Sequence, residues 1–313
     1  MRHDIELPLG PPRRIPVPIR VEPRSARHGL IGSAFDYLMR FEIARRVPVV
    51  EDRWIADHVA DGRCELTLSK MKDQLRKFCE SRTDFRADEF ADDWEESRPV
   101  RTGRASCQIV FDDPHDIYFI RLVRKVVVEA RSDIAAYRAI ARPSIGEQKQ
   151  AAFQAVRLAK IDVVFRAGLL DPTFEDAERD DLTELVELLG IVPWEQLLQG
   201  DCPILNPVFG CKELGIGADG DLLCGDCLIE IKTTKLNSVE PEWLDQQLGY
   251  FILARYHHRR DEREPEVTRL GLYLARHGYL WLRDASEWTD RPGFAEFEKW
   301  FLDQMPGRHL SPE

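Results

Sequence analysis

Two pieces of sequence decide the fold: GADGDLLCGDCLIEIKTTK, residues 217–235, and PEWLDQQLGYFILARY, residues 241–256. In the first piece, short apolar runs lie on both sides of Gly225-Asp226, a residue pair typical of tight turns. This pattern predicts a hairpin of two buried strands. The second piece is expected to form a helix. A strand hairpin followed by a helix therefore organises the rest of the chain.

Charged side chains gather on one face of the expected hairpin. Side chains alternate between the two faces of a strand, so Glu230 and Lys232 point to the same side of the second strand. On the first strand the same alternation places Asp219 and Asp221 together. Pairing across the turn would bring the two sets face to face, so that two or three carboxylates and one amine converge.

Carboxylates at the end of a buried sheet repel one another unless a cation offsets their charge. Mg²⁺ suits such a place, because it takes one or two protein carboxylates together with water and substrate phosphate. A neighbouring lysine can orient or deprotonate the attacking water, and the cation stabilises the charge that develops on a phosphodiester. The residue types therefore point to phosphodiester hydrolysis with Mg²⁺, for which Mn²⁺ can substitute.

The spacing of the hairpin residues resembles a known signature. Asp221, followed nine positions on (230 minus 221) by Glu230-Ile231-Lys232, resembles the D…(D/E)-X-K signature of the PD-(D/E)XK nuclease superfamily. This resemblance implies that Asp221 and Glu230 bind the metal, with the backbone carbonyl of Ile231 as a third ligand. It implies that Lys232 is the catalytic lysine. The proline that commonly precedes the aspartate in that superfamily is absent.

The following helix extends the resemblance. Gln246 and Tyr250 resemble the Q-X-X-X-Y motif of the RecB-like and λ-exonuclease-like branches. They lie four residues apart and therefore on one helix face. The resemblance implies that they position the site or the nucleic-acid backbone. The competing interpretation of the whole pattern is an exposed hairpin in which Glu230 and Lys232 form only a salt bridge.

A second helix shares the resemblance. HGLIGSAFDYLMRFEIARR, residues 28–46, is expected to be an amphipathic helix that Ser33 caps. RecB-like nucleases open their core with such a helix, which presents a His or Glu to the metal. Asp36 stands at that kind of position, so the resemblance makes it a candidate metal ligand. The alternative is a surface ion pair with Arg40, four residues further on.

The expected fold class is α/β. The resemblance implies a restriction-endonuclease-like core, with a mixed sheet of four or five strands flanked by helices and a large helical insertion. The core is expected to end in a hairpin around residues 276–278 and a helix over 294–305. The predicted divisions are an extended Pro-rich arm (1–27), the first core helix (28–50), the insertion (51–200) and the nuclease core (201–313).

Two long helices, over 117–142 and 147–170, are expected in the insertion on either side of Pro143, with a third over 181–189. Asp162 and Arg166 are four residues apart in the second of these. They are expected to form an ion pair beside the core; the other interpretation is that Arg166 reaches a nucleic-acid phosphate.

Composition limits the classes of protein. The 313 residues are 43% hydrophobic, which is adequate for a core, and the formal charge of −11 argues against a uniformly basic nucleic-acid coat. A local basic groove would still suffice, and basic clusters occur at 121–125 and 257–260, although either fits a solvated helix face. No run approaches the roughly 20 apolar residues that cross a bilayer. With no signal peptide evident, a cytoplasmic location without membrane partners is expected.

The seven cysteines are expected to be reduced thiols. Cys224 and Cys227 form a C-X-X-C that, with Cys202 and Cys211, has the ligand types of a zinc or iron–sulfur site. The geometry argues against it, because Gly-Asp between the first pair is needed for the turn. Glu213, upstream of the first strand, is a further candidate for the acidic site; the other interpretation is an exposed loop carboxylate.

Together these patterns and the resemblance predict an Mg²⁺-dependent nuclease. The resemblance implies that it acts on DNA, in repair or in defence against foreign DNA. The alternatives are an RNA-directed nuclease, or a non-cleaving subunit of the same fold that binds nucleic acid or protein. A protein partner or activator and the oligomeric state are open.

Overall fold

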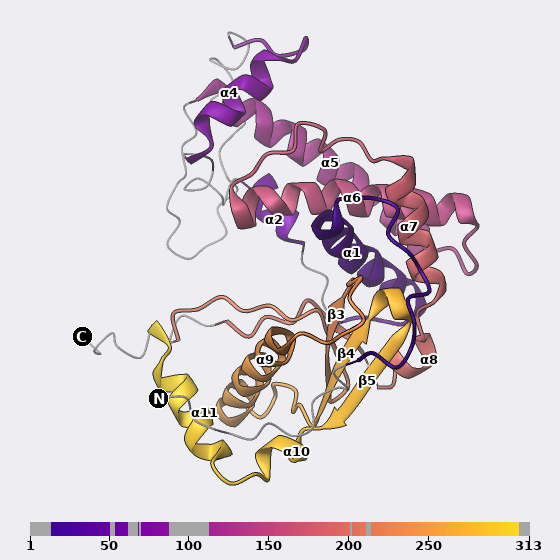
Figure 1. Cartoon of the computed structure of the whole chain (residues 1–313). Helices are drawn as coiled ribbons and strands as arrows, with labels where there is room; N and C mark the ends of the chain where they lie inside the picture. Colours follow the sequence, from indigo (N-terminus) through magenta and orange to yellow (C-terminus); the bar gives the residue numbers. More distant parts are fainter. Residues whose placement is uncertain are drawn as a thin grey trace. The chain divides into compact units, whose positions relative to one another are not determined.

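The computed structural model in Figure 1 describes residues 14–50, 54–61, 68, 70–87, 113–200, 202–210 and 214–306. The chain divides into two compact units. The sheet unit comprises Met1–Pro23, Arg46–Asp52 and Glu187–Glu313, and the helical unit comprises Arg24–Arg45 and Arg53–Val186. Each unit is described separately below.

A mixed sheet forms the centre of the sheet unit. Within the described residues it has five strands in the order β1-β2-β3-β4-β5. Only β3 and β4 are parallel, and the other neighbours are antiparallel. The expected α/β architecture with a mixed sheet flanked by helices is confirmed. The strands are β1 (Ile204–Leu205), β2 (Leu222–Cys224), β3 (Cys227–Lys232), β4 (Arg269–Leu274) and β5 (Tyr279–Asp284).

The predicted hairpin is the β2–β3 pair. Cys224 pairs with Cys227, which leaves the predicted two residues in the turn. Gly225 has a φ of +59°, a conformation that glycine adopts without steric cost and that two-residue hairpin turns favour. The carboxylate of Asp226 accepts a hydrogen bond of 2.5 Å from Nη2 of Arg269, so the turn also holds the first residue of β4.

Helix α9 (Pro241–Arg260) crosses from β3 to β4, as a parallel pair requires, and lies along one face of the sheet (Figure 1). It packs there because its buried apolar side chains meet those that the strands present on that face. The helices α10 (Ser286–Thr289) and α11 (Phe294–Asp303) follow β5 and add to the same core, so the expected last helix is confirmed. The core includes Leu223, Leu228, Leu248, Phe251, Ile252, Leu270, Leu272, Trp281, Phe294 and Leu302.

The predicted terminal hairpin is the β4–β5 pair. The short 3₁₀ helix η2 (Ala275–His277) and Gly278, with a φ of +58°, form its turn. His277 is fully buried, and its ring nitrogens lie 2.7 Å from the carbonyl oxygen of Val17 and 3.0 Å from that of Leu236. The backbone N–H of Arg20 donates to the carbonyl of Arg276 at 2.8 Å. Residues 14–23 of the Pro-rich arm therefore pack against the body of the sheet unit.

The helical unit contains the helices expected around Pro143. In α5 and α6, the side chains of Asp113 and Ser144 accept backbone N–H bonds at the N-termini, and Glu147 completes a capping box in α6. Gly168, with a φ of +63°, ends α6. The helices are α1 (His28–Arg46), α2 (Ile55–Ala60), α4 (Lys72–Glu80), α5 (Pro114–Arg138), α6 (Ile145–Ala167) and α7 (Arg179–Gly190). The C-terminal ends of α1 and α7, from Arg46 and from Glu187, belong to the sheet unit. Helix α8 (Trp194–Leu197) also belongs to the sheet unit.

Helix α1 spans the expected residues, but two details of its prediction are wrong. The helix begins at His28, so Ser33 lies inside it and does not cap it. It is also buried nearly all round between Ala34 and Ile43, where an amphipathic helix would have exposed one side. All of the helix except Arg46 is grouped with the helical unit, and its role as the first helix of a nuclease core stays a prediction.

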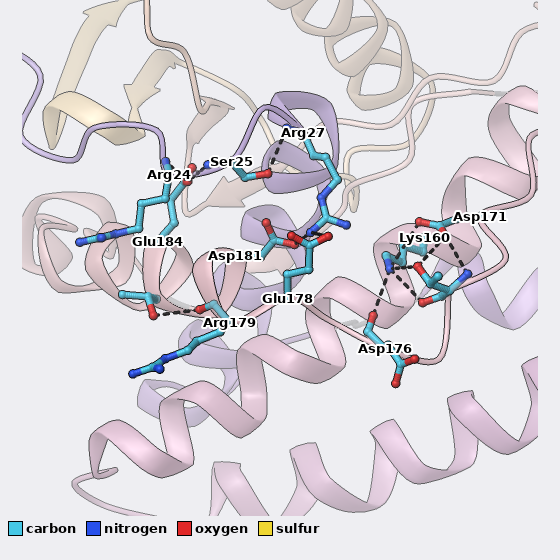
Figure 2. A network of polar contacts seen from close by, with 12 residues as sticks. Arg24, Ser25, Arg27, Lys160, Asp171, Asp176, Glu178, Arg179, Asp181 and Glu184 are labelled. Carbon is cyan, nitrogen blue, oxygen red and sulfur yellow. Dashed lines mark hydrogen bonds and ion pairs between the residues drawn. The ribbon is translucent and has the colours of Figure 1, made fainter.

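A buried lysine holds the connection between α6 and α7, as Figure 2 shows. Lys160 is 2% exposed, and its Nζ donates to the carbonyl and hydroxyl oxygens of Thr173 at 2.9 and 2.8 Å and to the carbonyl of Asp176 at 3.1 Å. A buried ammonium is tolerated because these oxygens replace its water, with Asp171 supplying opposite charge at 3.4 Å.

Two buried carboxylates of α7 hold the segment that leads into α1 (Figure 2). Oε2 of Glu184 accepts bonds from the backbone N–H groups of Arg24 at 2.6 Å and Ser25 at 3.2 Å. Oδ2 of Asp181 lies 2.5 Å from Nη2 of Arg27. Together they fix the start of α1 to a helix about 160 residues later in the chain.

Candidate functional site

The hairpin places two carboxylates opposite each other. Asp221 immediately precedes β2, and the pair Leu222–Ile229 makes Glu230 its neighbour across the strands. Residues directly opposite in an antiparallel pair share one face of the sheet, with Cβ atoms about 5 Å apart. Glu230 is 4% exposed, so the hairpin is buried and the alternative of an exposed hairpin is wrong on this point.

Each carboxylate has a bonded partner within the hairpin. Oδ2 of Asp221 accepts a hydrogen bond of 2.6 Å from the backbone N–H of Ile231, at the point where the β2–β3 pairing ends. Oε1 of Glu230 lies 2.7 Å from Nζ of Lys232. The salt bridge that the competing interpretation expected therefore forms, and it brings the amine next to Glu230.

Helix α9 completes a series of hydrogen bonds. Nζ of Lys232 also donates to Oε1 of Gln246 at 2.9 Å, and Nε2 of Gln246 donates to the hydroxyl oxygen of Tyr250 at 2.8 Å. The structure thus brings together Glu230, Lys232, Gln246 and Tyr250, which the sequence selected from two separate motifs. Gln246 is exposed, so the series is reachable from solvent.

The hydroxyl group of Tyr250 lies near the acids of the hairpin. Burial raises the pKa of its phenol above the ordinary value, and the negative charges of Glu230, Asp221 and Asp219 raise it further. The hydrogen bond from Gln246 opposes this rise. Three carboxylates therefore lie within electrostatic reach of one hydroxyl group, as the strand alternation predicted.

Sequence reasoning missed the residues that support Tyr250. The ring of Phe209 lies 5.9 Å from the Tyr250 ring, and Nε2 of His257 lies 2.8 Å from the carbonyl oxygen of Phe209. The spacing of Tyr250 and His257, seven residues and about two helical turns, placed both on one face of α9. Their common partner on the loop after β1 had no local signal.

The donor atoms suit a hard divalent cation, since two opposed carboxylates are the number that Mg²⁺ commonly takes from a protein. Asp219 is a third carboxylate further along the same face. Among the residues that the structure describes, however, no group of three or more His, Cys, Asp or Glu side chains is arranged to hold a metal ion. The metal ligands, including the carbonyl of Ile231, stay predictions.

Asp36 belongs to the helical unit. Its carboxylate forms an ion pair with Nη2 of Arg40, as the alternative interpretation expected. This pair is not on the surface, because Arg40 is 3% exposed. The carboxylate of Asp36 raises the pKa of the Arg40 guanidinium, although burial opposes this. The ion pair does not support the role of Asp36 as a metal ligand, which stays a prediction.

Asp162 and Arg166 form the expected intrahelical pair, with Nε of Arg166 3.6 Å from Oδ2 of Asp162. The hydroxyl of Tyr37, which the sequence did not indicate, donates to Oδ1 of Asp162 at 2.9 Å. Burial raises the pKa of Asp162 to about 6, although the Tyr37 bond and the charge of Arg166 lower it.

The cysteines give no support to a thiolate site. Cys224 and Cys227 are buried and not disulfide-bonded, and burial raises the pKa of Cys227 to about 12, which keeps it a thiol at neutral pH. Cys202 is exposed and likewise not disulfide-bonded. Cys211 and Glu213, the other candidates, lie outside the described residues.

The two basic clusters are partly engaged in structural contacts. Nε of Arg124 donates to the carbonyl of Ala60 at 2.7 Å. Nη2 of Arg259 lies 3.0 Å from Oε2 of Glu298, and His257 contacts the loop as described above. These contacts fit the interpretation as helix faces.

None of the described helices combines the length and apolar character needed to cross a membrane. The chain matches no family model, no curated protein and no solved structure.

Proposed function

We propose that the sheet unit is a Mg²⁺-dependent nuclease of the PD-(D/E)XK type, with a restriction-endonuclease-like core, that hydrolyses DNA phosphodiester bonds. One observation carries the proposal: residues chosen from a strand motif and a helix motif form one hydrogen-bonded series, Glu230–Lys232–Gln246–Tyr250, beside Asp221. If the two motifs matched the family pattern only by chance, their residues would not be expected to meet in one hydrogen-bonded series.

In this proposal Asp221 and Glu230 hold the metal. A divalent cation bound there would neutralise charge on the phosphate and favour ionisation of an attacking water. Lys232 acts on the water itself. An ammonium has three N–H donors, and the bonds to Glu230 and Gln246 use two of them. The third holds a water or phosphate oxygen at a fixed distance from Nζ.

Gln246 orients Lys232 and Tyr250 together. Its amide accepts from Nζ through Oε1 and donates to the phenol through Nε2. Reversing the amide would break the contact with Lys232, because an amide NH₂ group cannot accept a hydrogen bond from an ammonium. The phenol oxygen of Tyr250 is the acceptor in the second contact, which leaves its own O–H proton to donate to a phosphate oxygen. A shift of α9 along its axis would therefore disturb the whole series.

DNA as the substrate, and a role in repair or defence, follow from the branches that the motifs resemble. A metal held by these carboxylates, and Lys232 beside it, would act on phosphate and not on sugar, so an RNA substrate is one outcome of the test below. Binding without cleavage is the other.

The test is incubation of the purified protein with linear and circular, single- and double-stranded DNA and with RNA, in Mg²⁺, Mn²⁺ or EDTA. We expect cleavage of DNA that EDTA abolishes. Lys232→Ala should reduce the rate by roughly 10²- to 10⁴-fold, because the water-activating amine is lost. Lys299→Ala, at an exposed lysine of α11, is the matched control and should cut as wild type does.

Equal activity of the Lys232→Ala variant would show that the site is assigned wrongly. Binding of DNA without cleavage in either metal would replace the proposal with a non-cleaving subunit.

A further inference from the structure

The residue after Gln246 is a second glutamine, and its side chain points into the protein. Gln247 is 2% exposed. Its Nε2 contacts the carbonyl oxygen of Leu228 on β3 at 3.3 Å and forms a short hydrogen bond with the carbonyl oxygen of Gly271 on β4. A side-chain amide nitrogen has two N–H donors, so one group can serve both carbonyls.

These two carbonyls belong to the strands that α9 itself connects. Other buried side chains of α9, among them Leu248, Phe251 and Ile252, belong to the apolar core against the sheet. Apolar contacts are non-directional and tolerate small rotations and shifts of a helix. Hydrogen bonds depend steeply on distance and angle. The Gln247 amide therefore supplies a buried directional contact that fixes the height and rotation of the helix on the sheet.

Fixing Gln247 on the sheet also fixes the position of Gln246, because both belong to one rigid helix. Successive residues on a helix are separated by 1.5 Å along the axis and 100° around it. Once Gln247 is held over β3 and β4, the reach of Gln246 to Lys232, 2.9 Å from Oε1 to Nζ, is set. A shift of about 1 Å would lengthen that contact beyond hydrogen-bonding distance.

We propose that Gln247 is a positioning residue for Lys232: it ties α9 to the carbonyls of Leu228 and Gly271, and so holds Gln246 against the lysine amine. This inference rests on the proposed function in so far as Lys232 is taken to be catalytic. The geometric part, from Gln247 through Gln246 to the amine, stands without it.

The test measures the amine directly. The Nζ and Cε signals of Lys232 are followed by NMR in protein with isotope-labelled lysine and are assigned with Lys232→Arg. Gln247→Met keeps the length of the side chain and removes its donors. Its Lys232 signals should move toward those of the exposed lysines, in the same direction as in Gln246→Met, which removes the amide contact itself.

A matched control separates positioning from stability. Ile252→Val removes one buried methyl from the same helix, which lowers stability modestly, and leaves Gln247 intact. Its Lys232 signals should stay at the wild-type position. If cleavage is observed, Gln247→Met should lower kcat roughly tenfold, the effect of one misplaced hydrogen bond, with little change in KM.

Gln247→Glu supplies a rescue and a second variant in case Gln247→Met does not fold. A carboxylate has no donor, whereas a carboxylic acid has one. The Lys232 signals should therefore differ from wild type at pH 8 and approach those of wild type at the same pH as the solution is acidified.

Unchanged Lys232 signals in Gln247→Met, or an equal shift in Ile252→Val, would overturn the inference. If the wild type cleaves nothing while the signals shift as expected, the proposed function fails and the positioning stands.

Discussion

Replacing Asp162 by Asn is expected to change how the stability of the helical unit depends on pH. Asp162 is 5% exposed in α6, and burial raises its pKa from 3.8 to about 6 in the folded protein. A carboxyl whose pKa is raised by folding binds its proton more tightly when folded. Its contribution to stability is therefore complete below the unfolded pKa, is lost as the pH rises toward 6, and stays lost above it.

The size of the effect follows from the shift in pKa. A shift of roughly 2 units, at about 1.4 kcal/mol per unit, corresponds to about 3 kcal/mol of unfolding free energy between pH 3.5 and pH 7. Asn cannot ionise, but its amide oxygen still accepts the bond from Tyr37. As the pH rises from 3.5 to 7, the unfolding free energy of the Asn variant should therefore increase by about 3 kcal/mol relative to that of the wild type.

Urea unfolding, followed by circular dichroism at several pH values, measures this difference. Comparison with wild type cancels the titration of the other carboxyls, which both proteins share. Tyr37→Phe tests the same reasoning with a change that should increase the pH dependence of stability. Its hydroxyl bond lowers the pKa of Asp162, so the Phe variant should lose more stability than wild type as the pH rises. Parallel curves for wild type and the Asn variant would refute the reasoning.

Three further outcomes are expected. Asp221→Asn should weaken Mg²⁺ binding in calorimetry while leaving the thermal midpoint nearly unchanged, because an amide oxygen can still accept the bond from Ile231. Gly271→Ala should destabilise the protein by roughly 1–3 kcal/mol in urea unfolding, since a Cβ there would lie 2.9 Å from Cδ2 of Leu282. Lys160→Met should lower the unfolding free energy by roughly 2 kcal/mol or more in the same measurement, because buried oxygens lose their donor. For either of the last two variants, a stability equal to that of the wild type would contradict the expectation.

Local signals were sufficient for the parts of the fold that neighbouring residues decide. Gly225-Asp226 predicted the turn, and strand alternation placed Asp221 on the face that carries Glu230; the observed register then sets the two opposite each other. Pro143 predicted the break between two long helices. Each prediction depends on steric rules that act within a few residues, so the sequence alone carries it.

Contacts between distant residues could not be predicted. Tyr37 meets Asp162 over a separation of 125 residues, and Arg24 meets Glu184 over 160. No spacing rule connects such pairs. The two adjacent glutamines show a related limit. The sequence selected Gln246 by its distance from a tyrosine, whereas only the packed helix shows that Gln247 faces the sheet.

The sheet unit is discontinuous along the chain, and this affects the order in which the protein can fold during synthesis. Val17 contacts His277 over a separation of 260 residues, whereas Arg24–Arg45 and Arg53–Val186 contain the whole helical unit. At a synthesis rate of about 5–20 residues per second, His277 is made roughly 15–50 s after Val17, so the arm has no binding site during that time. The helical unit can fold during that interval. Nascent chains should therefore pass through a stage in which the helices resist protease and the arm is still cleaved.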